Sequence, residues 1–331
     1  TGVNISPSGK RALIVARGEV FTIPKKHGPT RNLTQSPGAR EKDAVWSPNG
    51  KWIAFLSDRN GEYQIFIQDP LAKNPAIRLT NFKNGYRHTL RWSPDSKRIA
   101  FTDQTHTLYF VNISSKKLTR VDKANFENVD ISMDLKAIYD CNWSPDSRYL
   151  AYSKMDSTLV NKIYIYTLKD KIVKCISEGL FNDFQPLFSP DGEHLFFISN
   201  RRFSPAFGDF EWEMVYKKMA GIYAYTLRKN GPALFPLKDD EENETPANHK
   251  KKTSVNVHID FAGLNNRIEA LPLKRGNYRH LTINQKRLFY LNKDQGDFNR
   301  FEFRNHKPMD LYAFSFKDRK EEALIKKIST Y

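Results

Sequence analysis

The sequence repeats one ten-residue phrase along most of its length. WSPNGKWIAF begins at Trp46, WSPDSKRIAF at Trp92 and WSPDSRYLAY at Trp143, and weaker copies begin at Ile5 and Phe188. The serines of the five copies are residues 6, 47, 93, 144 and 189, so the copies are 41, 46, 51 and 45 residues apart. Repeats of this length, rich in β-forming residues, are typical of propeller blades, each a four-stranded antiparallel sheet. The repeat therefore predicts an all-β propeller.

Each copy of the phrase predicts a tight turn between two strands. In Ser93–Ser96, proline presets the φ of the second position and aspartate tolerates the third, which specifies a type I turn. Gly50 and Gly192 occupy the fourth position in two copies, where glycine permits a positive φ. Ser96 and Ser147 occupy it in two others, and a left-handed backbone would cost each about 1 kcal/mol. The sequence gives no reason for serine at these two positions.

The strands around each turn can be traced into blades. Apolar second strands suit a sheet buried on both faces, third strands alternate aromatic and aliphatic residues, and a short fourth strand closes each unit. We expect one propeller domain over 1–331, with six blades evident and a seventh started or truncated at 329–331. The expected blades are approximately residues 2–34, 42–80, 87–121, 137–177, 183–260 and 278–329.

The fifth blade is longer than the others. Its excess lies in two segments, 203–220 and 229–252, which we expect to be insertions that project from the rim of the blade. The second insertion contains an acidic run at 239–242 and a basic run at 249–252, so its charges largely cancel.

Composition limits the function classes. The net charge of +16 raises nucleic acid as a partner, but lysine and arginine decorate solvent-facing loops and the densest basic run is neutralised within its own segment. No stretch approaches the roughly 18 apolar residues that span a bilayer. Cys141 and Cys175 fall on the first and fourth strands of one blade, roughly 14 Å apart, so we expect two buried free thiols. We predict that the chain neither binds nucleic acid nor inserts into a membrane.

No catalytic motif emerges from the sequence. It has no HExxH, GxSxG or CxxC motif and no glycine-rich phosphate loop. A single SxxK match, Ser114 to Lys117, falls in a turn between two strands without a preorganised pocket. We therefore predict no catalytic residue, no metal ligand and no cofactor in this chain.

Several longer segments of the sequence resemble one protein family. The succession GVNISPSGKRALIVARGEVFTIP, WSPNGKWIAFLSDRNGEYQIF, FSPDGEHLFFISNRRFSP and VHIDFAGLNNRIEALPLKRGNY is similar to the second propeller of tricorn-type proteases. The resemblance implies a seven-bladed ring in a serine peptidase, a hydrolase whose catalytic serine and histidine follow both propellers. None of those segments is in this chain, so no catalytic role is carried onto its residues.

The resemblance implies a channel that passes unfolded peptides or oligopeptides to a protease domain outside this chain. From strand position we predict that the lining residues are Lys42, Arg87, His88, Tyr139, Asp183 and Arg279. The remaining domains of the parent protease are expected partners, and the parent protein could form homo-oligomers. The compartment stays open between cytoplasmic and bacterial periplasmic or exported.

Two alternatives come from other classes. A TolB-like propeller would bind another protein through one face. A stand-alone propeller enzyme would need histidines or carboxylates clustered at equivalent blade positions, and the sequence shows no such cluster.

Overall fold

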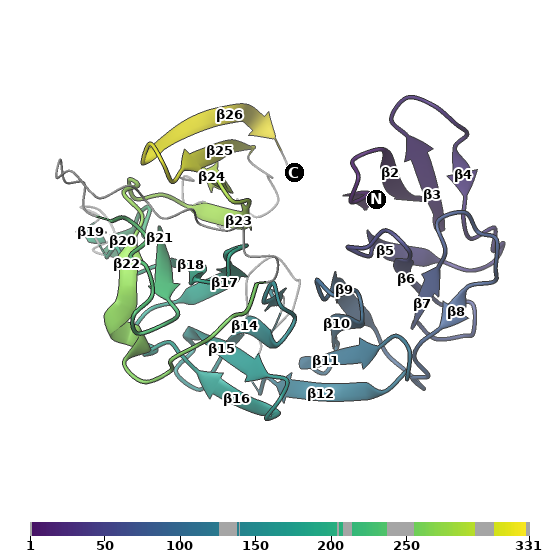
Figure 1. Cartoon of the computed structure of the whole chain (residues 1–331), viewed down its shortest axis with the longest axis horizontal. Coiled ribbons are helices and arrows are strands. Elements are labelled where there is room, and N and C mark those ends of the chain that lie inside the picture. Colours follow the sequence, from purple (N-terminus) through teal and green to yellow (C-terminus); the bar gives the residue numbers. More distant parts are fainter. Residues whose placement is uncertain are drawn as a thin grey trace, which may run out of the picture. The chain divides into compact units, whose positions relative to one another are not determined.

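The computed structural model describes residues 2–125, 138, 140–203, 205–207, 214–236, 255–294 and 308–328. Over these residues the chain is an all-β protein, a β-propeller of four-stranded antiparallel blades (Figure 1). This confirms the fold class predicted from the repeat. Contacts divide the chain into two units, Thr1–Glu127 with Lys136–Cys141, and Asn128–Leu135 with Asn142–Tyr331, which are described separately.

The first unit holds three described blades. In each sheet the strands lie in chain order, and we refer to the first strand as the inner strand and the fourth as the outer strand. Blade 1 contains β1 (Val3–Ile5), β2 (Arg11–Ala16), β3 (Glu19–Pro24) and β4 (Arg31–Asn32). Blade 2 contains β5 (Glu41–Trp46), β6 (Ile53–Ser57), β7 (Gln64–Gln68) and β8 (Ile77–Arg78). Blade 3 contains β9 (Arg87–Trp92), β10 (Arg98–Asp103), β11 (Thr107–Asn112) and β12 (Leu118–Lys123).

The second unit holds three further described blades of the same construction. Blade 4 contains β13 (Asn142–Trp143), β14 (Tyr149–Met155), β15 (Asn161–Thr167) and β16 (Ile172–Cys175). Blade 5 contains β17 (Asp183–Phe188), β18 (His194–Ser199), β21 (Gly221–Thr226) and β22 (Ile268–Ala270). Blade 6 contains β23 (Tyr278–Ile283), β24 (Arg287–Lys293), β25 (Met309–Ser315) and β26 (Lys320–Ile328). The expected start of a seventh blade, 329–331, lies outside the described residues.

Blade 5 differs from its predicted extent. Its outer strand β22 begins at residue 268, beyond residue 260 where the sequence placed the end of the blade. Val257 and Ile259 instead pack into the core of the unit ahead of a short 3₁₀ helix, η1 (Leu264–Arg267). Within the 203–220 segment, β19 (Pro205–Phe207) and β20 (Met214–Tyr216) pair as a separate two-stranded sheet. Most of the 229–252 segment lies outside the described residues.

The repeated serines are parts of the turns that they begin. Ser93 Oγ accepts a hydrogen bond from the Arg98 backbone N–H at 3.0 Å and donates one to the Asp95 carboxylate. Ser144 and Ser189 make the same pair of contacts within their own turns, and Ser47 does so with the amide oxygen of Asn49 in place of a carboxylate. All four are fully or almost fully buried. The repeated phrase therefore has a structural role, because each serine hydroxyl makes the hydrogen bonds that close its hairpin turn.

The turn geometry also explains the serine at position 96. Ser96 adopts a left-handed conformation with φ of 59°, in the position that Gly50 occupies with φ of 71°. The Ser96 hydroxyl accepts the backbone N–H of Asn49, from the turn of the neighbouring blade, at 3.1 Å. A glycine would relax the backbone but would leave this inter-blade donor without its acceptor.

Apolar side chains pack between adjacent blades of each unit. One cluster joins blades 1 and 2, another joins blades 2 and 3, and similar clusters lie between blades 4 and 5 and between blades 5 and 6. The last residues of four inner strands share one register, with Trp46 opposite Ile53 and Phe188 opposite Leu195. Three of these end residues are buried, but Trp92 is only half-buried and donates its indole N–H to the Val45 carbonyl at 3.3 Å.

The two cysteines are both free thiols. Cys141 is buried, and burial raises its pKa to about 11. Cys175 is exposed, which corrects the expectation of two buried thiols, because it lies on β16, the outer strand of its sheet, which pairs with a described strand along one edge only. In the described part of the chain, no helix has the length and apolar character needed to span a bilayer.

Candidate functional site

The predicted lining residues lie on inner strands of both units. Lys42 is in β5, Arg87 and His88 are in β9, Asp183 is in β17 and Arg279 is in β23. Tyr139 lies outside the described residues. Each of the described residues is the first or second residue of its inner strand, in blades 2 and 3 of the first unit and in blades 5 and 6 of the second.

Each of these four inner strands contains a bulge directly after the predicted positions. The register with the second strand shifts between Lys42 and Val45, and equivalent shifts occur in β9, β17 and β23. A left-handed residue other than glycine lies at every shift, and these residues are Asp43, Thr89, Gln185 and His280, with φ between 53° and 57°. Bulges re-aim the side chains beside them and strengthen local twist. Nothing in the side-chain pattern signalled this feature.

Arg87 and Asp183 are buried, each with 2% of its surface exposed. The Arg87 guanidinium lies 3.8 Å from the centroid of the Phe82 ring, and burial lowers its pKa. Asp183 accepts from Arg201 at 3.2 Å, and burial raises the pKa of its carboxyl. Both side chains contact their own blades instead of solvent, so the lining role predicted for them does not fit their position one residue before the exposed step.

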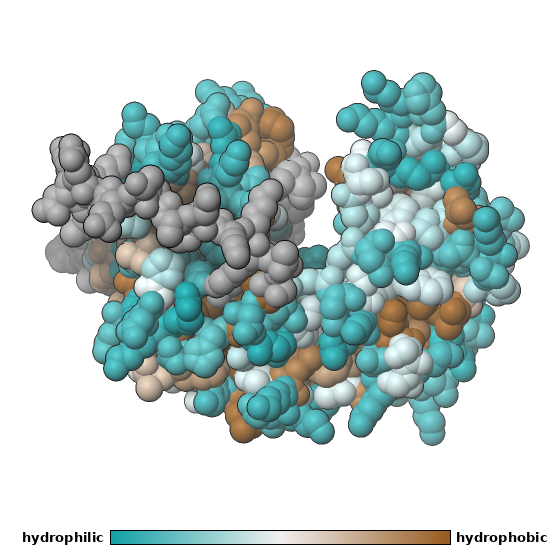
Figure 2. All heavy atoms as spheres, in the orientation of Figure 1, coloured by the Kyte–Doolittle hydropathy of each residue, from teal (hydrophilic) through white to brown (hydrophobic). Residues whose placement is uncertain are grey.

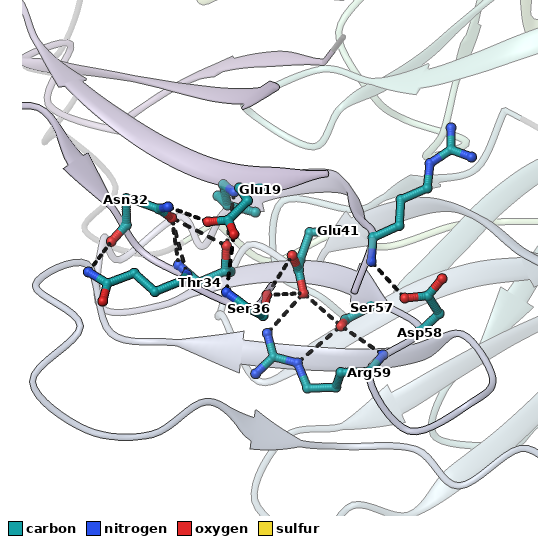
Figure 3. Close-up of polar contacts among 11 residues, drawn as sticks. Glu19, Asn32, Thr34, Ser36, Glu41, Ser57, Asp58 and Arg59 are labelled. Atoms are coloured by element: carbon teal, nitrogen blue, oxygen red, sulfur yellow. Dashed lines mark hydrogen bonds and ion pairs between the residues drawn. The ribbon is translucent and has the colours of Figure 1, made fainter. Parts of the chain in front are cut away.

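A buried ion pair recurs at this position in blades 2 and 5. Glu41, 1% exposed, accepts from Ser57 Oγ at 2.8 Å and from Arg59 at 3.0 Å, and Ser36 donates to the same carboxylate (Figure 3). In blade 5, Asp183, Ser199 and Arg201 form the corresponding group. The signal was present in the sequence as serine and arginine two residues apart at the end of the second strand, in LSDRNG and ISNRRF.

Lys42, His88 and Arg279 are at least partly exposed. The Lys42 ammonium lies 4.2 Å from the centroid of the Tyr63 ring and 5.4 Å from that of Tyr86. The two rings are 6.0 Å apart, and Tyr86 is 58% exposed. Burial raises the pKa of the Tyr63 hydroxyl. This cation and aromatic pair combines residues that are far apart in the sequence, and sequence reasoning missed it.

Comparison with known proteins places the chain in a family. The family described as the Tricorn protease second beta propeller domain matches residues 1–331. The chain belongs to this family.

Relatives of this tricorn propeller are longer proteins. Tricorn protease homolog 1 of Streptomyces coelicolor is 25% identical over 283 residues, which cover 83% of this chain and 26% of that protein. The crystal structure of the tricorn protease has the same fold, with a TM-score of 0.76 at 15% identity over 98% of this chain and 31% of that chain. The Tol-Pal system protein TolB of Francisella tularensis is 25% identical over 196 residues, 46% of this chain and 44% of that protein. The chain thus spans under a third of the tricorn proteins that it matches.

The described residues of this tricorn propeller contain no group of three or more histidine, cysteine, aspartate or glutamate side chains that could hold a metal ion. On the face drawn in Figure 2, hydrophilic residues cover most of the described surface and hydrophobic ones form scattered patches.

Proposed function

We propose that this chain is the non-catalytic propeller of a tricorn-like serine peptidase. In this role it gates unfolded peptides or oligopeptides on their way to a protease domain outside this chain. The observation that carries the proposal is the family match over the whole chain. The repeated serines support the non-catalytic part, because they are buried in their turns and bonded to backbone groups. Hydrolysis requires an activated nucleophile beside a base, which such serines do not provide.

The gating role rests on the exposed side chains of the inner strands. Lys42, His88 and Arg279 present polar groups at the same step of three blades. Polar, solvated side chains bind an extended chain weakly and release it again. Tyr139, at the corresponding place in the sequence, completes the proposed lining.

A direct test titrates the purified chain with a labelled disordered peptide and, separately, with a folded protein. We expect weak binding of the peptide, weaker still at high salt because exposed charges are screened, and no turnover of a fluorogenic peptide panel. Replacing Lys42 and Arg279 by alanine should reduce peptide binding. The matched control replaces Arg120 and Lys326, exposed residues of outer strands, and makes the same change in net charge.

Two outcomes would contradict the proposal. Peptide turnover that survives purification and increases with the amount of protein would show that the chain is itself catalytic. Tighter binding to a folded protein than to any disordered peptide would support the TolB-like alternative, a propeller that binds another protein, which the similarity to TolB favours.

A further inference from the structure

A pocket in the first unit brings three basic side chains together. It has a volume of about 560 Å³ and lies between the β2–β3 turn and the start of β5. Arg17, Arg40 and Lys42 line it, together with Glu41 and Asp43. The volume is within the range of roughly 300–1,000 Å³ that is typical of small-ligand sites.

The charges in this pocket do not cancel. Glu41 is already bound by Arg59 at 3.0 Å and by two serine hydroxyls, so its carboxylate is compensated from inside the blade (Figure 3). Asp43 is the other acidic residue of the lining. Within the part of the chain that the structure describes, neither Arg17 nor Arg40 forms an ion pair through its side chain. The lining therefore has more positive than negative charge that is not already paired.

The backbone around these arginines is held in place. The Arg40 N–H donates to Asp58 Oδ1 at 2.7 Å, and the Glu41 N–H donates to the Gly18 carbonyl at 2.8 Å. The second bond ties β5 to the β2–β3 turn that carries Arg17, and the first ties Arg40 to the residue that follows β6. The two guanidinium groups consequently project from fixed positions on neighbouring blades.

Lys42 connects the pocket to the Tyr63 and Tyr86 rings. Its ammonium lies over both rings while the residue also lines the pocket. A positively charged, anion-binding pocket is thus adjacent to the exposed ring of Tyr86. A peptide with an acidic residue near an apolar one has the matching chemistry, because arginine binds carboxylates in a two-pronged geometry and tyrosine packs against apolar side chains.

We propose that this pocket binds a carboxylate of an extended acidic peptide through Arg17 and Arg40, with the Tyr63 and Tyr86 rings packing against a neighbouring apolar side chain. The proposal rests on the proposed peptide-gating function and assigns it a substrate class. A nucleic acid fits less well. Its backbone carries regularly spaced charges that need a continuous basic stripe, whereas Asp43 lines this pocket and Asp58 lies beside Arg40.

The test measures fluorescence anisotropy of the whole chain with two short, labelled, disordered peptides. One contains glutamate and leucine, and the other has glutamine in place of every glutamate. We expect the glutamate peptide to bind more tightly and the R17Q/R40Q variant to lose about tenfold of that affinity, since two charge-assisted contacts are removed. The variant should change the affinity for the glutamine peptide by less than about twofold.

The matched control is K25Q/K26Q, which makes the same change in net charge at exposed residues after β3. Its affinity for the glutamate peptide should stay close to that of the unmodified chain. A far-ultraviolet spectrum and a thermal midpoint show whether each variant is folded. If R17Q/R40Q is unfolded, R17K/R40K provides the test, because lysine keeps the charge but not the two-pronged geometry.

The outcomes separate this proposal from the proposed function. Equal binding of both peptides, unaffected by R17Q/R40Q, would overturn the carboxylate site and leave peptide gating standing. Binding of neither peptide would contradict peptide gating itself. A thymidine oligonucleotide that displaces the glutamate peptide at lower concentration than unlabelled peptide would assign the pocket to nucleic acid and overturn the proposal.

Discussion

Replacing Ser93 by alanine should destabilise the first unit without creating a large cavity. The hydroxyl is fully buried, accepts the Arg98 N–H at 3.0 Å and donates to the Asp95 carboxylate. Without it the Arg98 N–H loses a side-chain acceptor. Asp95 keeps its bonds to the Lys97 N–H at 3.0 Å and to the Arg98 guanidinium at 3.1 Å, so no unpaired charge is left behind.

The magnitude follows from these contacts. A buried donor without a partner costs about 1–3 kcal/mol, and because Arg98 is only half-buried we expect about 1–2 kcal/mol. Urea unfolding followed by tryptophan fluorescence measures the change as a lower midpoint at constant slope. Trp92, the preceding residue, is a local reporter of the hairpin.

The control for this prediction is Ser115→Ala. Ser115 is exposed, and its hydroxyl only accepts the Lys117 N–H at 3.3 Å, so its loss should change stability by less than about 0.5 kcal/mol. If Ser93→Ala and Ser115→Ala had the same small effect, the structural role assigned to the repeated serines would be refuted.

Three further predictions use other parts of the structure. Ser96→Gly should not stabilise the chain although it relaxes a left-handed residue, because the hydrogen bond from the Asn49 N–H to the Ser96 hydroxyl is lost, and the same urea assay measures the result. Phe101→Ala should cost about 3–5 kcal/mol and Trp92→Ala less, because Phe101 is fully buried and Trp92 only half-buried. Burial lowers the pKa of His194, so the unfolded chain binds protons more readily and stability should fall as the pH drops below about 6.5. In His194→Gln this loss, followed by thermal unfolding across pH, should be reduced.

The sequence predicted the blades because hairpin chemistry is local. Ser93, Pro94 and Asp95 specify their turn within a few residues, and the apolar run after them specifies a strand buried on both faces. The blade-to-blade period then predicted the all-β fold. The outer strand β22 escaped this reasoning because it has only three residues and pairs through its backbone.

The site was harder to predict because burial changes with each residue along a strand. Arg87 and His88 are adjacent, yet only Arg87 is buried, since successive side chains of a strand point to opposite faces. The partners of Glu41 and of Lys42 come from other strands and loops, so no local pattern reports them. The left-handed residues of the inner strands are of different types, such as Asp43 and Thr89, so no single residue type in the sequence identifies the bulges.

The bulges of the inner strands determine how a passing chain would be held. The free edge of an unbroken strand is a template on which another strand adds through backbone hydrogen bonds, and such pairing is slow to dissolve once it extends over several residues. In β5, β9, β17 and β23 the left-handed residue turns part of that edge out of line, so a continuous ladder cannot form along it. Under the proposed gating function, an extended polypeptide at these edges would be left with side-chain contacts that break one at a time. Such contacts would favour sliding over capture and would limit aggregation of the propeller with unfolded chains.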